Sequence, residues 1–267
     1  MKILTHQTDS IILEGLFNSL NTISDPFPIW NPSTPIFKIL DKQKPDLFFC
    51  DSSLIKSSVL AAVAEYNIPT VVSGLIDFPQ TKLHIIPEYI NVKIRENVVQ
   101  PYYLMRYAAN LVKEYPKYPA SNIVIYNTDQ TPERILEYIK ILQENNILFK
   151  VVGNKVPIPE YVGEVDLADI VGLCKTAKIN IATDSEYIYD IAVQKRLILL
   201  MSDLQPIDNL LKLINYWDNI KEVQRATKQA YEDTIKNNTY YHRASDIFNL
   251  LGYKEEAEKC LLKVSEF

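Results

Sequence analysis

Short apolar runs rich in β-branched and aromatic residues alternate with longer segments of helical period along most of this 267-residue chain. This alternation is typical of successive strand and helix units that build a parallel sheet. The first half therefore has the pattern of a Rossmann-like domain. Its expected strands are Lys2–Thr5, Asp46–Cys50, Thr70–Ser73 and Leu83–Ile86, and its expected helices are Ser10–Leu20, Ile55–Tyr66 and Tyr102–Glu114.

The pattern starts again after the stretch YPKYPAS at Tyr115–Ser121. Two prolines within four residues oppose both a helix and a central strand, so we place a domain boundary there, between domains 1–116 and 121–267. In the second domain the expected strands are Ile123–Tyr126, Phe149–Val152, Tyr161–Val165, Lys178–Ala182 and Leu197–Met201. Its expected helices begin at Thr131, Leu167 and Tyr187, and the pattern from Pro206 onward is helical.

Two such sets in one chain predict an α/β protein with two Rossmann-like domains facing across a cleft and a helical C-terminal segment. Ligands of these sheets bind outside the carboxyl ends of the strands. The most informative polar residues are therefore those that directly follow a predicted strand.

Composition narrows the function classes. Apolar residues make up 47% and charged residues 23%, which predicts a chain that folds throughout. The net charge of −5 gives no overall field to attract a polyanion, so nucleic acid is a weak default partner. The N-terminus lacks the apolar core of a signal peptide, and no apolar run approaches the roughly 20 residues of a membrane span. We expect a cytoplasmic protein with no transmembrane segment.

The three cysteines, Cys50, Cys174 and Cys260, are widely separated and odd in number. They predict buried thiols in a reducing compartment rather than a disulfide framework. No pair of His or Cys occurs at zinc-ligand spacing, so no metal site is predicted. The sequence also contains no G-x-S-x-G, P-loop or G-x-G-x-x-G motif, which removes the main support for hydrolase, NTPase and common dinucleotide-binding functions.

Three stretches carry a resemblance to a known family: YVGEVDLADIVGLCKTAKINI (Tyr161–Ile181), SEYIYDIAVQKRLILLMSD (Ser185–Asp203) and NTYYHRASDIFNLL (Asn238–Leu251). Together they resemble the carboxyl-terminal domain of group 1 glycosyltransferases of the GT-B fold, and most closely the spore-maturation-protein type. The resemblance implies a nucleotide-diphosphate-sugar donor bound mainly by the second domain and an acceptor bound mainly by the first. It also implies transfer without an obligatory metal or other cofactor.

The same resemblance assigns a role to Asp190, which stands where the family usually has a glutamate that holds the donor ribose hydroxyls. A carboxylate suits two vicinal hydroxyls because it offers two acceptor oxygens. The chain departs from the family at Ala182, where many relatives have an acid, and at Lys195, where the family favours glycine.

Further donor-binding candidates follow predicted strands of the second domain. Asp184, Ser185 and Glu186 open the short helix that contains Tyr187, where they either meet a ligand or cap the helix. Asp184 and Glu186 stand near Ala182, the position where many relatives have an acid.

Basic residues form another set of candidates. Gly153, Asn154 and Lys155 close a strand, where the lysine either contacts a diphosphate leaving group or sits in a polar turn. Lys195 and Arg196 are possible diphosphate contacts or a solvated helix end. His242 and Arg243, the His-Arg pair of the third matching stretch, are further possible site residues.

In the first domain His6, Gln7, Thr8 and Asp9 follow the first strand and precede a helix. If transfer inverts the anomeric centre, a general base must take the acceptor proton, and His6 or Asp9 has the right chemistry. The alternative is that Asp9 or Ser10 caps the helix while His6 is a satisfied strand-end residue. Asp51, Ser52 and Ser53 after the next strand have the same two interpretations.

The leading hypothesis is a glycosyltransferase that moves a sugar to a glycan, lipid-linked or macromolecular acceptor. One alternative is a catalytically degenerate nucleotide- or sugar-binding protein, which the low glycine content favours. A second alternative is a viral or phage enzyme that glycosylates DNA bases, for which a basic strip beside the cleft is required.

Overall fold

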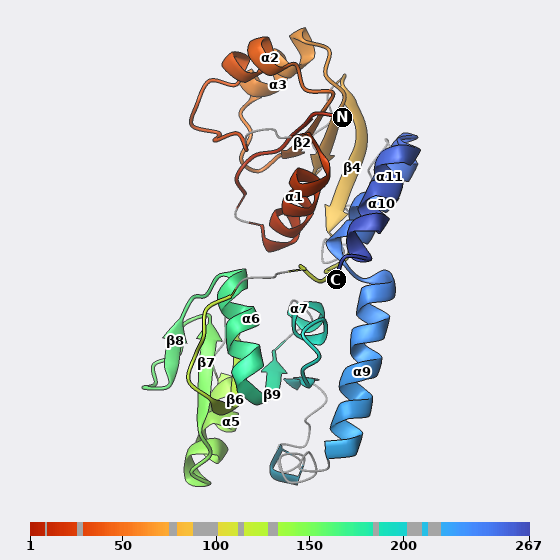
Figure 1. Ribbon diagram of the computed structural model, residues 1–267. Helices are drawn as coiled ribbons and strands as arrows, with labels where there is room; N and C mark the ends of the chain where they lie inside the picture. Colours follow the sequence, from red (N-terminus) through yellow and green to blue (C-terminus); the bar gives the residue numbers. More distant parts are fainter. Residues whose placement is uncertain are drawn as a thin grey trace. The chain divides into compact units, whose positions relative to one another are not determined.

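The computed structural model describes residues 1–8, 10–25, 29–74, 79–87, 101–111, 115–127, 133–183, 187–201, 210–212 and 220–267. The chain forms two compact units, which can be followed in Figure 1. The first unit contains Met1–Ala108 and Tyr240–Phe267, and the second contains Ala109–Thr239. Each unit has its own parallel sheet and its own core, as the alternating pattern of the sequence predicts.

Within the described residues, the sheet of the first unit has five parallel strands in the order β1-β2-β3-β4-β5. An isolated parallel bridge between His6 and Trp30 adds a short extended segment outside β1. This segment follows β1 in the chain and lies on the side of β1 opposite to β2. The chain therefore extends the sheet first on one side of β1 and then on the other, so the strand order reverses between β1 and β2. The elements are β1 (Ile3–Leu4), α1 (Ile11–Ile23), α2 (Phe37–Gln43), β2 (Leu47–Asp51), α3 (Ser57–Glu65), β3 (Thr70–Ser73), β4 (Thr81–Pro87) and β5 (Tyr102–Met105).

The C-terminal helices α10 (Tyr240–Leu251) and α11 (Lys254–Val264) belong to the first unit. Figure 1 shows them in blue beside the elements of that unit. The ring of Tyr240 packs so closely on α1 that a Cβ added at Gly15 would lie 2.3 Å from its Cε2 atom. Phe248 of α10 stacks edge-on against Phe49 of β2, with 6.4 Å between ring centroids.

These contacts correct the predicted division into 1–116 and 121–267. The chain crosses into the second unit at Ala109, before the proline-containing stretch, and returns to the first unit at Tyr240. The sequence pattern did not show the return, because an amphipathic helix does not specify which sheet it covers.

The second unit has the strand order β10-β9-β6-β7-β8, again all parallel. In chain order this is the arrangement 3-2-1-4-5 of a Rossmann-like sheet, and the order reverses between β6 and β9. The elements are β6 (Ser121–Asn127), α5 (Glu133–Glu144), β7 (Phe149–Gly153), β8 (Tyr161–Gly163), α6 (Leu167–Thr176), β9 (Ala177–Ala182), α7 (Ile188–Ala192), β10 (Ile198–Leu200) and α9 (Ile220–Asn237).

Local sequence explains where several of these elements begin. α6 starts with a capping box, in which Asp166 accepts from the Asp169 N–H and Asp169 accepts from the Asp166 N–H. The helix predicted at Tyr102–Glu114 is wrong over its described residues: Tyr102–Met105 is a strand that pairs with β4 from His84 to Pro87, and residues 106–111 are not helical. Residues 112–114, and Thr131 at the predicted start of α5, lie outside the described residues.

The three cysteines are free and buried, as predicted. Burial raises the pKa of Cys174 and of Cys260 to about 12, so both thiols stay protonated near neutral pH. Buried protonated thiols are poor nucleophiles, which leaves these residues a packing role.

Candidate functional site

The carboxyl ends of β6 and β9 form the reversal point of the second sheet, where ligands of this architecture bind. Asn127 ends β6 and Thr183 follows β9. The Thr183 N–H donates to the Tyr126 carbonyl oxygen (3.1 Å), which fixes the first residue beyond β9 against β6. Asn127 and Thr183 were not singled out from the sequence, although each directly follows a buried apolar run, which is the signal that marked their neighbours.

Gly153 and Asn154 lie beside Asn127 at the same edge. The Asn154 N–H donates to the Asn127 carbonyl oxygen (2.7 Å), and the Asn127 amide donates back to the Asn154 carbonyl oxygen (3.0 Å). Gly153 has φ +93°, and a Cβ there would lie 2.3 Å from the Asn127 carbonyl oxygen. Glycine is therefore required, because only it permits both the backbone conformation and the close approach. Lys155 follows with an exposed side chain.

Asp190 lies in α7 and is buried, at 2% exposure. One of its carboxylate oxygens accepts from the Asn110 N–H (2.8 Å) and from the Asn110 side-chain amide (3.1 Å). The carboxylate thus holds the chain where it enters the second unit. Direct binding of the donor ribose by Asp190 stays a prediction, and the observed contact gives that oxygen a different partner.

Tyr187, the residue before α7, packs its ring against Tyr126 with 5.8 Å between ring centroids. Tyr187 belongs to the same hydrophobic cluster as Tyr126 and Val152, which lie near the carboxyl ends of β6 and β7. Asp184, Ser185 and Glu186 connect β9 to this residue and lie outside the described residues, so their predicted roles stay predictions.

Lys195 has φ +55°, the left-handed conformation that favours glycine. The ammonium of Lys195 lies 4.3 Å from the ring centroid of Tyr231 in α9, a cation–π contact. Arg196 is half-buried and close enough to Cys174 that its positive charge favours the thiolate of that residue. A diphosphate contact by either residue stays a prediction.

In the first unit His6 lies at the reversal point between β1 and β2, with 2% exposure. The Asp51 N–H donates to His6 Nε2 (2.8 Å), so Nε2 is the acceptor nitrogen and Nδ1 carries the hydrogen. Nδ1 then donates to the Gln7 carbonyl oxygen (2.6 Å). Both ring nitrogens are engaged, which matches the alternative of a satisfied strand-end histidine. A general-base role for His6 would require it to release one of these partners.

Asp51 connects His6 to the neighbouring polar residues. Its carboxylate accepts from the Thr8 hydroxyl (2.7 Å) and from both the N–H (3.0 Å) and the hydroxyl (2.7 Å) of Ser53. The segment after β1 is thereby tied to the segment after β2. Asp9, the other predicted base, lies outside the described residues. Its neighbour Ser10 is the residue before α1 but makes no side-chain cap.

Protonation of His6 should destabilise the first unit. Burial lowers the pKa of His6 below its usual value of about 6.5, although the Gln7 carbonyl and Asp51 act in the opposite direction. The unfolded chain therefore binds this proton more readily than the folded protein. The contribution of His6 to stability is complete above about pH 6.5 and is lost as the pH falls through the folded-state pKa. Urea titrations at pH 7.5 and pH 5 should show a smaller loss of stability on acidification in His6→Gln than in the parent protein. Equal pH dependence of stability in His6→Gln and in the parent protein would contradict this role of His6.

His242 and Arg243 lie in α10 and therefore in the first unit. Arg243 is buried, and its guanidinium donates to the Tyr107 carbonyl oxygen (3.3 Å). Beside it the Tyr103 hydroxyl donates to Asp246 (2.9 Å), and burial is the main cause that raises the pKa of Tyr103. These contacts attach α10 to β5. The His-Arg pair therefore belongs to the first unit, whereas the donor-binding candidates belong to the second.

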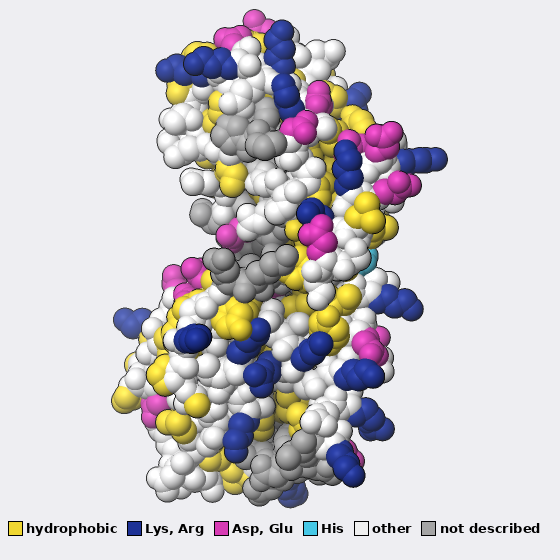
Figure 2. All heavy atoms as spheres, viewed as in Figure 1, with side chains coloured by type: hydrophobic (Ala, Val, Ile, Leu, Met, Phe, Trp, Pro, Cys, Tyr) yellow, Lys and Arg dark blue, Asp and Glu magenta, His cyan; other side chains and the backbone are white. Residues whose placement is uncertain are grey.

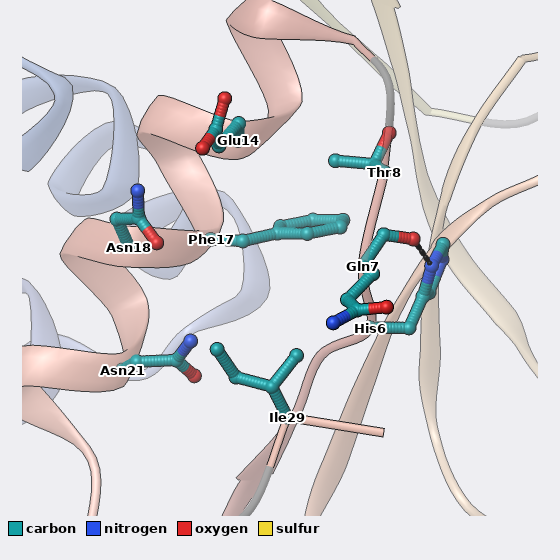
Figure 3. A pocket seen from close by; sticks show the side chains of 8 residues that line it. All are labelled: His6, Gln7, Thr8, Glu14, Phe17, Asn18, Asn21 and Ile29. Carbon is teal, nitrogen blue, oxygen red and sulfur yellow. Dashed lines mark hydrogen bonds between the residues drawn. The ribbon is translucent and has the colours of Figure 1, made fainter. Parts of the chain in front are cut away.

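A cavity of about 130 Å³ lies between the segment after β1, α1 and Ile29. Figure 3 shows its lining side chains. The ring of Phe17 projects from α1 toward His6, with 5.5 Å between ring centroids, and amide side chains stand at both ends of the cavity.

In the part of the chain that the structure describes, no group of three or more His, Cys, Asp or Glu residues is arranged to hold a metal ion. Nor does any helix there have the length and apolar character to cross a membrane.

The chain has the GT-B fold, in which two Rossmann-like units occur in one chain. No protein-family profile and no curated protein sequence matches it. Among solved structures, HepE of Anabaena in complex with UDP and glucose is similar at a TM-score of 0.55 and 12% identity, over 94% of this chain and 99% of that one. Two others have lower TM-scores. The calicheamicin glycosyltransferase CalG4 has 0.38 at 10% identity, over 80% of this chain and 77% of that one. The UDP-GlcNAc 2-epimerase of Methanocaldococcus jannaschii has 0.43 at 12% identity, over 79% and 86%.

Proposed function

We propose that this protein is a glycosyltransferase that takes a sugar from a nucleoside-diphosphate donor and transfers it to a glycan, lipid-linked or macromolecular acceptor. The observation that carries the proposal is the fold likeness to HepE, which spans nearly the whole of both chains and whose structure contains UDP and glucose. The strand order of the second unit supports it, because its reversal point is where a nucleotide binds in such sheets.

The donor site is the carboxyl edge of the second sheet. Asn127, Asn154 and Thr183 are held there by the backbone bonds described above, so their positions are set before a ligand arrives. Lys155 extends from this edge with an exposed ammonium, which suits a diphosphate whose negative charge grows as the glycosidic bond breaks. Because the ammonium of Lys155 would neutralise this charge, the proposed transfer does not require a metal ion.

The acceptor is bound by the first unit. If the reaction inverts configuration, Asp9 is the preferred candidate for the general base, because both ring nitrogens of His6 already have hydrogen-bond partners. The tie between Thr8 and Asp51 holds the residue before Asp9 in place.

Figure 2 shows Lys and Arg side chains spread over this face together with Asp and Glu side chains. The net charge of −5 gives no overall field that would attract a polyanion. Transfer to DNA bases is therefore the less favoured alternative.

UDP should stabilise the protein against thermal unfolding, whereas uridine should do so much less. A ligand that binds only the folded state adds about 2.7 kcal/mol at a hundredfold excess over its Kd. Lys155→Ala should weaken UDP binding about tenfold and leave uridine binding unchanged, because only UDP carries the diphosphate. Thermal shift and calorimetric titration with both ligands measure these effects.

Lys178→Ala is the matched control, because Lys178 is an exposed lysine near the start of β9, at the opposite edge of the same sheet. It should bind UDP like the parent protein. Release of UDP from a panel of UDP-sugars then tests turnover. UDP binding without consumption of any UDP-sugar, in the presence of oligosaccharide acceptors, would contradict a transferase and support a binding protein.

A further inference from the structure

The cavity beside α1 has the wall of a carbohydrate site rather than of an apolar void. It is lined by the amides of Gln7, Asn18 and Asn21, by the carboxylate of Glu14, by the ring of Phe17 and by the side chain of Ile29 (Figure 3). Amide groups both donate to and accept from hydroxyl groups, a carboxylate accepts from them, and an aromatic ring adds apolar surface to the wall. We infer that this cavity binds one neutral pyranose ring of a saccharide.

Asn21 is held in the wall of the cavity by a hydrogen bond. Its side-chain oxygen accepts from the Thr5 hydroxyl (3.0 Å), so the position of this side chain is set before a ligand arrives.

The cavity is also built on a fixed framework. The Gln7 N–H donates to the Trp30 carbonyl oxygen (3.3 Å), and the Trp30 N–H donates to the Thr5 carbonyl oxygen (2.9 Å). These bonds hold the wall at Ile29 and the segment after β1 together. On the opposite wall Phe17 is buried at 4% exposure between His6 and Phe49, so its position is set by packing.

Size and charge agree with a single neutral ring. A cavity of about 130 Å³ is close to the roughly 150 Å³ that takes up one benzene ring in an engineered protein interior. A dinucleotide or a peptide segment is larger than this space. Among the described residues, the lining contains the carboxylate of Glu14 and no Lys or Arg, so these residues offer no cation to a phosphate or sulfate group.

The inference rests on the proposed function in one respect: it gives the acceptor its class, a carbohydrate whose ring is held by the first unit. It is tested without a donor. The probes are the methyl glycosides of glucose, galactose, mannose and N-acetylglucosamine, followed by saturation-transfer difference NMR. Cyclohexanol, a six-membered ring with one hydroxyl, tests whether an apolar ring suffices.

At least one methyl glycoside should bind and cyclohexanol should not. Asn18→Ala should weaken that binding about fivefold and Glu14→Gln about tenfold, which are the effects of losing a neutral and a charged hydrogen-bond partner. Both residues are exposed on α1, so both variants should fold, and thermal unfolding checks this. The matched controls are Asn249→Ala in α10 and Glu258→Gln in α11, which are exposed residues of the same unit away from the cavity.

Absence of binding by every glycoside would overturn the inference. So would binding that the two cavity variants leave unchanged, or equal binding of cyclohexanol. UDP binding is measured in the same samples. Glycoside binding without UDP binding would support the cavity as a sugar site and reject the proposed transferase. UDP binding without glycoside binding would reject the cavity as a sugar site and leave the proposed transferase in place.

Discussion

Replacing Gly153 by alanine should lower the free energy of unfolding of the second unit by about 3 kcal/mol and abolish most of its UDP binding. The backbone at Gly153 has φ +93°, which alanine rarely adopts, and the new Cβ would lie 2.3 Å from the Asn127 carbonyl oxygen. Relief of this overlap requires β6 and β7 to separate at the edge where we place the donor. Urea unfolding and a UDP titration on the same variant measure both effects.

Gly163→Ala is the control that distinguishes the effect of backbone strain from the effect of the overlap between the new Cβ and the Asn127 carbonyl oxygen. Gly163 ends the neighbouring strand β8 with φ +123°, and a Cβ there would meet nothing within 4 Å. This variant should lose only about 1 kcal/mol of stability and keep UDP affinity within about twofold. If the two variants behave alike, the close approach of Gly153 to Asn127 has no special importance.

Asp190→Ala should destabilise the second unit by about 3 kcal/mol. The substitution removes a buried carboxylate oxygen and leaves the Asn110 N–H and side-chain amide without that acceptor. Because Asn110 is the second residue of this unit, we also expect the chain around it to become more susceptible to limited proteolysis.

Asp190→Asn is the companion variant that distinguishes an internal anchor from a ribose ligand. Asparagine keeps one carbonyl oxygen for Asn110, so the loss of stability should be nearer 1 kcal/mol. If Asp190 serves as the anchor that the structure shows, the folded variant should bind UDP within about threefold of the parent. A loss of tenfold or more in a variant of parental stability would instead restore direct binding of the ribose.

Much of the fold was predictable because strand and helix periodicities are local properties of the sequence. The runs at Thr70–Ser73 and Phe149–Val152 are apolar and β-branched enough to mark buried strands without knowledge of their partners. Tyr102–Met105 was mistaken for a helix because its short aromatic run has no decisive period, and only pairing with β4 makes it a strand.

The candidate site was predictable in part for the same reason. Residues that follow a strand fall at the carboxyl edge, and Gly153 and Asn154 do lie at the end of β7, next to Asn127. Their role in donor binding stays a prediction. The partners of each side chain were not predictable. The bond between Asp190 and Asn110 joins residues 80 positions apart, and that between His6 and Asp51 joins residues 45 apart.

The sequence by itself determined that this chain builds two parallel α/β sheets and which polar residues follow their strands, because both follow from the order of short-range patterns. Only the tertiary structure decided that α10 and α11 return to the first unit, where Tyr240 fits over Gly15. It also decided that Asp190 and His6 are buried with internal partners. Such choices depend on packing and hydrogen bonding between distant segments, which no local pattern encodes.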